Sequence, residues 1–265
     1  MLMNIIDTFR LNGRTAIVTG GAGRYGRQIV EALGEAGATV FIASRDLSHC
    51  QETADAFIAQ GLDVRALRLD LGDRGSIDRL VAEVIAQTRR IDILVNNAVT
   101  RSACGGGWLQ EQESYDRSLH VNASATFYLT AAVAERMKQP KRGSIINVGS
   151  FMGLVGPEEA NYAGTDMGGN PSPIYFYEKG GMVNFTRWAA SVLGSHGIRV
   201  NAIHPGGLLE PHLPERFVKQ YSERTQLGRM ASQTDLKGIV VFLASDASAY
   251  ITGTNIPVDG GYTAK

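Results

Sequence analysis

A serine and a tyrosine–lysine pair are the residues of this chain whose types and spacing could move a proton. Tyr175 and Lys179 are four residues apart, so their side chains share one face if the segment is helical. A cation beside a phenol favours the phenolate, which lets a tyrosine exchange a proton with a substrate hydroxyl near neutral pH. Ser150, on another element, could hydrogen-bond the same oxygen. Together they predict proton transfer to or from a carbinol while a hydride is transferred elsewhere.

A tyrosine and a lysine at this spacing also occur by chance in many helices, so the prediction depends on the elements around them. The 265 residues have the composition of a soluble globular protein, with 44% hydrophobic and 20% charged residues. Lys and Arg together number 26, as do Asp and Glu, which argues against nucleic acid or an anionic membrane as a partner. No linker, repeat or transmembrane run divides the sequence, and we expect one domain over residues 1–265.

The cysteines indicate neither a disulfide nor a metal site. Cys50 and Cys104 form no spaced pair, and no cluster of Cys and His is present in the sequence. The N-terminus lacks the basic start and apolar core of a signal peptide. We therefore expect a metal-free protein in the reducing cytoplasm, with a small molecule as its substrate.

The first predicted strand leads directly into a glycine-rich turn. Residues 14–19 form a β-branched run, the turn contains Gly20, Gly23 and Gly26, and an amphipathic helical pattern follows. Such a turn leaves the N–H groups of the helix N-terminus free to bind a phosphate. A second strand at 39–43 completes the spacing that a dinucleotide site requires. We therefore expect a nucleotide half at about residues 10–100 and a catalytic and substrate half at about 100–265.

The residue at the end of the second strand distinguishes the two nicotinamide cofactors, because it lies next to the adenosine ribose. An acidic residue there favours NAD(H), whereas a basic one accommodates the 2′-phosphate of NADP(H). Arg45 occupies this position and Arg24 in the glycine turn could supply a second cation, so we predict NADP(H) over NAD(H). The alternative is that Arg45 lies in a solvated loop and Asp46 is the N-cap of the next helix.

Strand and helix patterns keep alternating, which predicts an α/β fold with a doubly wound parallel sheet and helices on both faces. With these motifs the chain resembles the short-chain dehydrogenase/reductase family, of its classical type. The resemblance covers residues 14–261, and the matching motifs are Thr19-Gly20 with Gly26, Asp70-Leu71, Asn96-Asn97-Ala98, Val121-Asn122, Ser150, Tyr175 with Lys179, Pro205-Gly206 and the glycine-rich end at Gly261. It implies a Rossmann-like oxidoreductase that transfers a hydride between a nicotinamide cofactor and a carbonyl or secondary alcohol.

The resemblance also implies roles for individual residues. Tyr175 would be the general acid and base, Ser150 would orient the substrate oxygen, and Lys179 would favour the phenolate and hold the nicotinamide ribose. Asn122 would be the fourth catalytic residue and would support a water that links the lysine to solvent. The implied cofactor-binding residues, besides Tyr175 and Lys179, are Gly20, Gly23, Arg24, Tyr25, Gly26, Arg45, Asp70, Leu71, Asn97, Ala98, Pro205 and Gly206.

Several features depart from the family pattern. Arg24 stands at the middle glycine position of the turn, and the resulting glycine spacing resembles the extended branch of the family. That branch includes epimerases and dehydratases with tightly bound NAD, so such an enzyme is the first alternative. The segment after Pro205-Gly206 lacks the threonine that usually binds the nicotinamide carboxamide. A non-catalytic nucleotide sensor is the second alternative, although a sensor would not need all four catalytic residues.

The spacing between serine and tyrosine also differs from the family. Ser150 and Tyr175 are 25 residues apart because a Gly- and Pro-rich insert at 151–173 separates them. Tyr162 lies 12 residues after Ser150 and competes for the catalytic role. Asp166 follows four residues later, where a carboxylate would disfavour the phenolate, so Tyr175 is preferred.

Loops after the carboxyl ends of the strands should supply the substrate contacts, at 100–108, 151–173 and 206–226. Carboxylates, amides and an arginine in these loops favour a sugar, sugar acid or polyol over a quinone-like or β-ketoacyl substrate. The substrate candidates are Arg101, as a ligand for an acidic group, Trp108 and Tyr162. Helices expected at about 115–137 and 175–193 often pair subunits in this family, so the resemblance implies a homo-oligomer, a dimer or tetramer.

Overall fold

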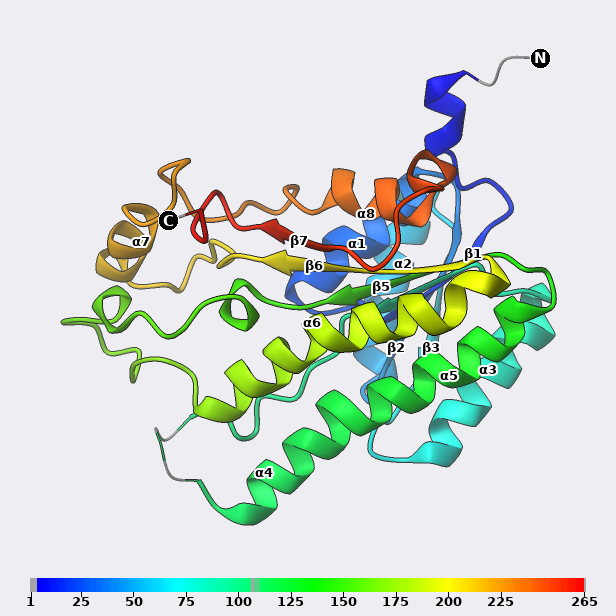
Figure 1. The fold of residues 1–265 in the computed structure, drawn as a ribbon. Coiled ribbons are helices and arrows are strands. Elements are labelled where there is room, and N and C mark those ends of the chain that lie inside the picture. The colour runs from blue at the N-terminus through cyan, green and yellow to red at the C-terminus, as the bar shows by residue number, and fades with distance from the viewer. Residues whose placement is uncertain (1–3, 106–107, 109, 265) are drawn as a thin grey trace.

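One parallel sheet of seven strands forms the centre of the computed structural model, which describes residues 4–105, 108 and 110–264. The strand order is β3-β2-β1-β4-β5-β6-β7 (Figure 1). The strands are β1 (Thr15–Thr19), β2 (Thr39–Ser44), β3 (Val64–Arg68), β4 (Ile93–Asn96), β5 (Gly143–Val148), β6 (Ile198–Pro205) and β7 (Asn255–Val258). The order reverses between β1 and β4, and in doubly wound folds such a reversal opens a crevice at the carboxyl ends of the strands.

Helices cover both faces of the sheet, because its central strands are buried on both sides. Alternate side chains of β1 enter two separate hydrophobic clusters, Ala16 and Val18 on one side and Ile17 on the other. The first face is covered by α1 (Arg24–Glu35), α2 (Leu47–Ile58) and α8 (Lys237–Ala244), and the second by α3 (Arg74–Thr88), α5 (Ala125–Lys138) and α6 (Pro173–Leu193) (Figure 1). This arrangement confirms the predicted doubly wound, Rossmann-like α/β fold.

The remaining elements gather at the ends of the sheet. They are α4 (Gln112–Leu119), α7 (Glu215–Ser222) and short 3-10 helices at Ile5–Phe9, Phe151–Gly153, Glu159–Asn161, Gly194–His196 and Asp246–Ser248. Among the described residues, no helix combines the length and apolar character needed to cross a membrane.

The helix expected at about 115–137 is interrupted. A π-helical turn at His120–Ser124 separates α4 from α5. Within this turn the Asn122 side chain is bonded to the backbone of Thr100, and the backbone carbonyl of Asn122 accepts from the Thr126 hydroxyl at 3.1 Å. The hydrophobic spacing of the sequence could not reveal the interruption, because it accompanies a contact with a distant segment. Such turns often mark functional sites.

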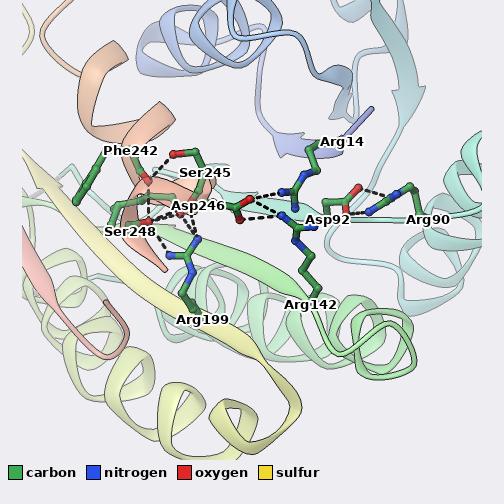
Figure 2. Close-up of polar contacts among 10 residues, drawn as sticks. Arg14, Arg90, Asp92, Arg142, Arg199, Phe242, Ser245, Asp246 and Ser248 are labelled. Carbon is green, nitrogen blue, oxygen red and sulfur yellow. Dashed lines mark hydrogen bonds and ion pairs between the residues drawn. The ribbon is translucent and has the colours of Figure 1, made fainter. Parts of the chain in front are cut away.

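Ion pairs tie the amino ends of the strands together, on the side of the sheet away from the crevice. Asp246 accepts from Arg14, just before β1, at 2.9 Å and from Arg142, just before β5, at 2.5 and 2.8 Å (Figure 2). Asp92, just before β4, binds Arg90 and also accepts from the Thr15 N–H at 2.9 Å. The strand order is therefore reinforced by charge at this end, which leaves the other end available for a ligand.

Replacing Asp246 by alanine is expected to lower the free energy of unfolding by about 1 kcal/mol, since the pairs are partly exposed and are each worth at most about that much. Urea denaturation followed by circular dichroism measures the change. Asp78→Ala is the matched control, because Asp78 is exposed on α3 and forms no ion pair with another described residue. Equal stability of the two variants would contradict the proposed role of Asp246.

Candidate active site

A cleft of about 780 Å³ lies at the carboxyl ends of the strands. Its walls come from the glycine turn, the ends of β2, β4 and β5, the start of α6 and the loop after β6. Asn122 and Trp108 do not line it, and the Trp108 side chain is 80% exposed. The residues predicted from the sequence that do line it are Gly20, Gly23, Arg24, Tyr25, Gly26, Arg45, Asp70, Leu71, Asn97, Ala98, Arg101, Ser150, Tyr162, Tyr175, Lys179, Pro205 and Gly206.

The glycine turn is shaped to admit a phosphate close to the backbone. Gly20 has a φ of +63°, and a Cβ on Gly26 would lie 2.2 Å from the Gly20 carbonyl oxygen. Gly23 is the N-cap of α1 and has no side chain that could cap the helix. The first N–H groups of α1 therefore have no side-chain acceptor at the N-cap. A pyrophosphate can accept from these groups, and the residues present therefore fit a dinucleotide.

Two side chains of the glycine turn reach across to the loop after β6. Arg24 Nε lies 3.2 Å from Glu210 Oε2, and the Tyr25 hydroxyl donates to the Gly206 carbonyl at 2.8 Å. Arg24, suggested from the sequence as a second cation for the 2′-phosphate, is thus paired with a carboxylate. The two contacts hold Gly206 beside the glycine turn.

The ribose end of the cleft contains one acidic and one basic residue after β2. Asp46 is the N-cap of α2, and its carboxylate accepts from His49 N–H at 3.0 Å and from the Ser48 hydroxyl at 2.6 Å. Arg45 is exposed, lines the cleft and forms no ion pair with another described residue. Asp46 therefore serves the helix, and Arg45 carries the charge that this end of the cleft presents.

The end of β4 is bonded to the glycine turn. Asn97 Nδ2 donates to the Thr19 carbonyl at 2.9 Å and to the Gly20 carbonyl at 3.0 Å. The Thr19 hydroxyl in turn accepts from the N–H groups of Asn97 and Ala98. Asn97 thus joins the end of β4 to the glycine turn. Asp70 lines the same region, and its carboxylate accepts from Gly72 N–H at 2.9 Å.

Ser150 follows β5 and is buried at the cleft wall. Its hydroxyl accepts from Met152 N–H at 3.2 Å, which starts a 3-10 turn and fixes the side chain. The imidazole of His204 is buried beside it. Its Nδ1 lies 3.1 Å from the Ser150 carbonyl oxygen, and its Nε2 lies 2.9 Å from Asn255 Oδ1. Both ring nitrogens of His204 are occupied, so this histidine supports the backbone of the serine.

Tyr175 and Lys179 lie on one face of α6, as their spacing predicted. Both side chains are buried at the cleft, and Lys179 Nζ is 5.9 Å from the centre of the Tyr175 ring. The ammonium donates to the Val148 carbonyl at 2.9 Å, which holds it against the end of β5. Ser150, Tyr175 and Lys179, far apart in the sequence, thus share one wall.

The charge of Lys179 is balanced between opposing neighbours. Burial, and after it the nearby Arg101 guanidinium, lowers the pKa of Lys179, whereas the Glu178 carboxylate raises it, and the resulting pKa is about 8. The ammonium therefore prevails at neutral pH and is lost as the pH rises through about 8.

Asn122 does not line the cleft, but its side chain forms two hydrogen bonds with the backbone of the segment after β4. Its Oδ1 accepts from Thr100 N–H at 2.8 Å, and its Nδ2 donates to the Thr100 carbonyl at 2.9 Å. The same Nδ2 lies 2.8 Å from Glu178 Oε2. Glu178 was not among the residues predicted from the sequence, although a carboxylate directly before Lys179 and three residues after Tyr175 was a usable signal.

The substrate end of the cleft is more apolar than the sequence suggested. Arg101 lines it, with its guanidinium carbon 5.9 Å from the centre of the Tyr175 ring, and pairs with no carboxylate of a described residue. Tyr162 lines it as well, and burial raises the pKa of Tyr162 to about 12, which agrees with the preference for Tyr175 as the acid and base. Apolar lining residues that sequence analysis did not select are Met152, Met167, Leu213, Phe217 and Met230.

Apart from Tyr162, the polar residues of the 151–173 insert do not line the cleft. Asn161 donates to the Tyr262 hydroxyl at 2.8 Å, and Glu158 lies 3.5 Å from Arg224. The insert instead packs its apolar side chains against α7, in a cluster that includes Phe151 and Phe217. Its composition was polar, but its tertiary contacts decide which side chains reach the ligand.

The fold and the cleft are those of a doubly wound α/β protein with a serine, a tyrosine and a lysine on one wall of the cleft that its glycine turn lines. A family model described as enoyl-(acyl carrier protein) reductase matches residues 25–263. The 3-oxoacyl-[acyl-carrier-protein] reductase FabG of Thermotoga maritima is 34% identical over 261 residues, which cover 95% of this chain and 98% of the relative.

Two solved structures show the same fold over nearly the whole chain. A short-chain type dehydrogenase/reductase from Mycobacterium marinum has a TM-score of 0.87 and 29% identity, covering 99% of this chain and 100% of the other. A gluconate 5-dehydrogenase from Burkholderia cenocepacia, in complex with NADP and tartrate, has a TM-score of 0.86 and 27% identity over the same shares. The chain belongs to the short-chain dehydrogenase/reductase family, and it is an oxidoreductase that acts on hydroxyl or carbonyl groups with a nicotinamide cofactor.

Proposed function

We propose that this protein is an NADP(H)-dependent oxidoreductase of a carbonyl or secondary alcohol, with Tyr175 as its general acid and base. The observation that carries the proposal is the convergence of Ser150, Tyr175 and Lys179 on one wall of the cleft that the glycine turn also lines. The relatives named above, a 3-oxoacyl reductase and a gluconate 5-dehydrogenase, support the reaction class.

The residues of the chain divide the proton chemistry between them. The nicotinamide, when bound, supplies or accepts the hydride. In the reductive direction the Tyr175 hydroxyl gives its proton to the developing alkoxide, and the Ser150 hydroxyl donates a hydrogen bond to the same oxygen. Lys179, buried and anchored on the Val148 carbonyl, keeps a positive charge beside the tyrosine and favours its phenolate form.

The preference for NADP(H) rests on the charge beside the ribose. Arg45 extends from the end of β2 without a carboxylate partner among the described residues, whereas Asp46 is occupied as a helix cap. A 2′-phosphate placed there would gain a charge-assisted hydrogen bond from Arg45. The gluconate 5-dehydrogenase solved with NADP is consistent with this choice.

The substrate we propose carries an acidic group that Arg101 binds. The guanidinium lies beside the Tyr175 ring, so it can hold a carboxylate while the carbinol faces the tyrosine hydroxyl. A sugar acid combines the two groups and is the first class to test. A 3-oxoacyl compound is the second class, favoured by the apolar wall that Met152, Met167 and Leu213 form.

Replacing Arg101 by alanine is expected to raise the KM for a sugar acid about 10- to 100-fold, because a hydrogen bond to a charged group contributes about 1.5–3 kcal/mol. Initial rates with gluconate, with the neutral polyol sorbitol and with a 3-oxoacyl thioester measure the effect for wild type and variant. Arg136→Ala, on the exposed side of α5, is the control.

The pattern across substrates decides between the classes. A selective loss for gluconate supports an acidic substrate, and turnover of the thioester alone supports the 3-oxoacyl class. Equal losses for gluconate and sorbitol would contradict a role for Arg101 in charge recognition. Absence of turnover with all three substrates, with either nicotinamide cofactor, would contradict the proposed function.

We also propose that the protein is a homo-oligomer, a dimer or tetramer. The outer surfaces of α5 and α6 expose large apolar side chains, which supports burial of this surface against another copy. These side chains are Phe127, Tyr128, Trp188 and Val192.

A further inference from the structure

Glu178 is a buried carboxylate whose position no part of the mechanism above explains. Only 8% of the residue is exposed, and it lies on α6 between Tyr175 and Lys179. Its Oε2 accepts from Asn122 Nδ2 at 2.8 Å, whereas its Oε1 is buried and has no hydrogen-bond partner among the described residues. A buried carboxylate is costly to the folded state unless it is paired, so stability alone gives no reason to keep one here.

The charges around Lys179 give Glu178 a function. Arg101 and Cys104 come from the loop after β4, and Tyr175 and Glu178 come from α6 itself. Burial and the Arg101 guanidinium both oppose the ammonium form, and the Glu178 carboxylate favours it. The Cys104 thiol lies in the same region, and burial raises its pKa, so it carries little negative charge at neutral pH. Glu178 therefore supplies a negative charge that opposes the effect of Arg101 on the lysine.

The second contact of Glu178 links it to the substrate loop. Asn122 binds both the N–H and the carbonyl of Thr100, the residue directly before Arg101. Glu178 accepts from the same Asn122 amide and holds it in the orientation that makes these bonds possible. One carboxylate thus binds Asn122, which supports the loop that carries Arg101, and belongs to the residue directly before the lysine on α6.

We propose that Glu178 is a positioning residue of the active site, which keeps Lys179 in its ammonium form and holds Asn122 against Thr100. The inference rests on the proposed function, since it assigns Glu178 to the proton chemistry of the Tyr175 centre. Glu178 does not line the cleft and acts through its two neighbours.

The first test is a titration of Lys179 in the free protein. The ¹³Cε resonances of lysine-labelled protein are followed against pH, and Lys179→Met assigns the signal. Glu178→Gln keeps the shape and an acceptor for Asn122 but removes the charge, so the Lys179 midpoint is expected to fall by about one pH unit. Glu135→Gln, on an exposed glutamate of α5, is the matched control and is expected to leave the midpoint unchanged.

The second test separates the contact from the charge. Glu178→Asp keeps the carboxylate but shortens the side chain, so hydrogen exchange of the Thr100 amide is expected to become about tenfold faster, which corresponds to about 1.4 kcal/mol of lost protection. The Lys179 midpoint in this variant is expected to stay closer to that of the wild type than in Glu178→Gln. If the glutamine variant does not fold, the aspartate variant decides by its exchange rate.

A Lys179 midpoint that does not move in a folded Glu178→Gln variant would overturn the proposal, as would unchanged Thr100 exchange in Glu178→Asp. Both measurements use free protein and require no substrate. A failure of the proposed function, seen as the absence of turnover, is therefore distinguishable from a failure of this inference.

Discussion

Replacing Tyr175 by phenylalanine is expected to lower kcat by about 10²- to 10⁴-fold, the range that a general acid or base contributes. The phenyl ring keeps the volume of the buried side chain but cannot give or take a proton, so the substrate oxygen is left with Ser150 alone. Affinity for the nicotinamide cofactor should remain within a few-fold of the wild type. Steady-state rates and equilibrium binding by nicotinamide fluorescence measure the two effects.

A neighbouring tyrosine provides the control for this experiment. Tyr177 lies two residues further along α6, is 73% exposed and faces away from the cleft wall. Tyr177→Phe removes the same hydroxyl from the same helix and should leave kcat unchanged. Near-normal turnover of Tyr175→Phe would overturn the assignment of Tyr175 as the acid and base.

Replacing Arg45 by alanine is expected to weaken NADPH binding by about 10- to 100-fold, since a hydrogen bond to a charged group contributes about 1.5–3 kcal/mol. NADH lacks the 2′-phosphate, so its affinity should change little. Titration of nucleotide-free protein with each cofactor, followed by nicotinamide fluorescence, gives the four dissociation constants. The wild type is expected to bind NADPH more tightly than NADH.

The controls of this experiment also test the alternatives. Arg187→Ala removes an exposed arginine of α6 that does not line the cleft. This change should alter neither the NADPH nor the NADH affinity. Equal losses for both cofactors in Arg45→Ala, or tighter NADH binding in the wild type, would contradict the NADP(H) assignment. Purified protein that retains stoichiometric NAD would instead support the epimerase or dehydratase alternative.

The architecture could be predicted because its signals are local. The β-branched run at 14–19 became β1 (Thr15–Thr19), and the run at 39–43 became β2 (Thr39–Ser44). A buried parallel strand needs apolar side chains on both faces, and an amphipathic helix needs them at helical spacing, so each pattern is visible in a short window. The break at Asn122 had no such pattern, because it accompanies hydrogen bonds to Thr100.

Partners of polar side chains were much harder to predict than elements. Arg24 was expected at a phosphate and is paired with Glu210, which lies 186 positions later in the chain by their numbers. The insert was expected to present carboxylates and an amide to the substrate, yet it contributes Met167 to the cleft while Asn161 binds Tyr262. In both cases the outcome depends on which segments the strand order brings together.

The sequence by itself determined the alternation of strands and helices, the glycine turn and the tyrosine–lysine face of one helix. These features depend on residue types a few positions apart, where backbone geometry fixes which side chains are neighbours. Only the tertiary structure decided that Glu178 meets Asn122, that Arg101 stands beside Tyr175 and that the cleft wall is apolar. The reason is physical: such contacts join segments that are distant in the chain, and their distances are set by the packing of the sheet and its helices.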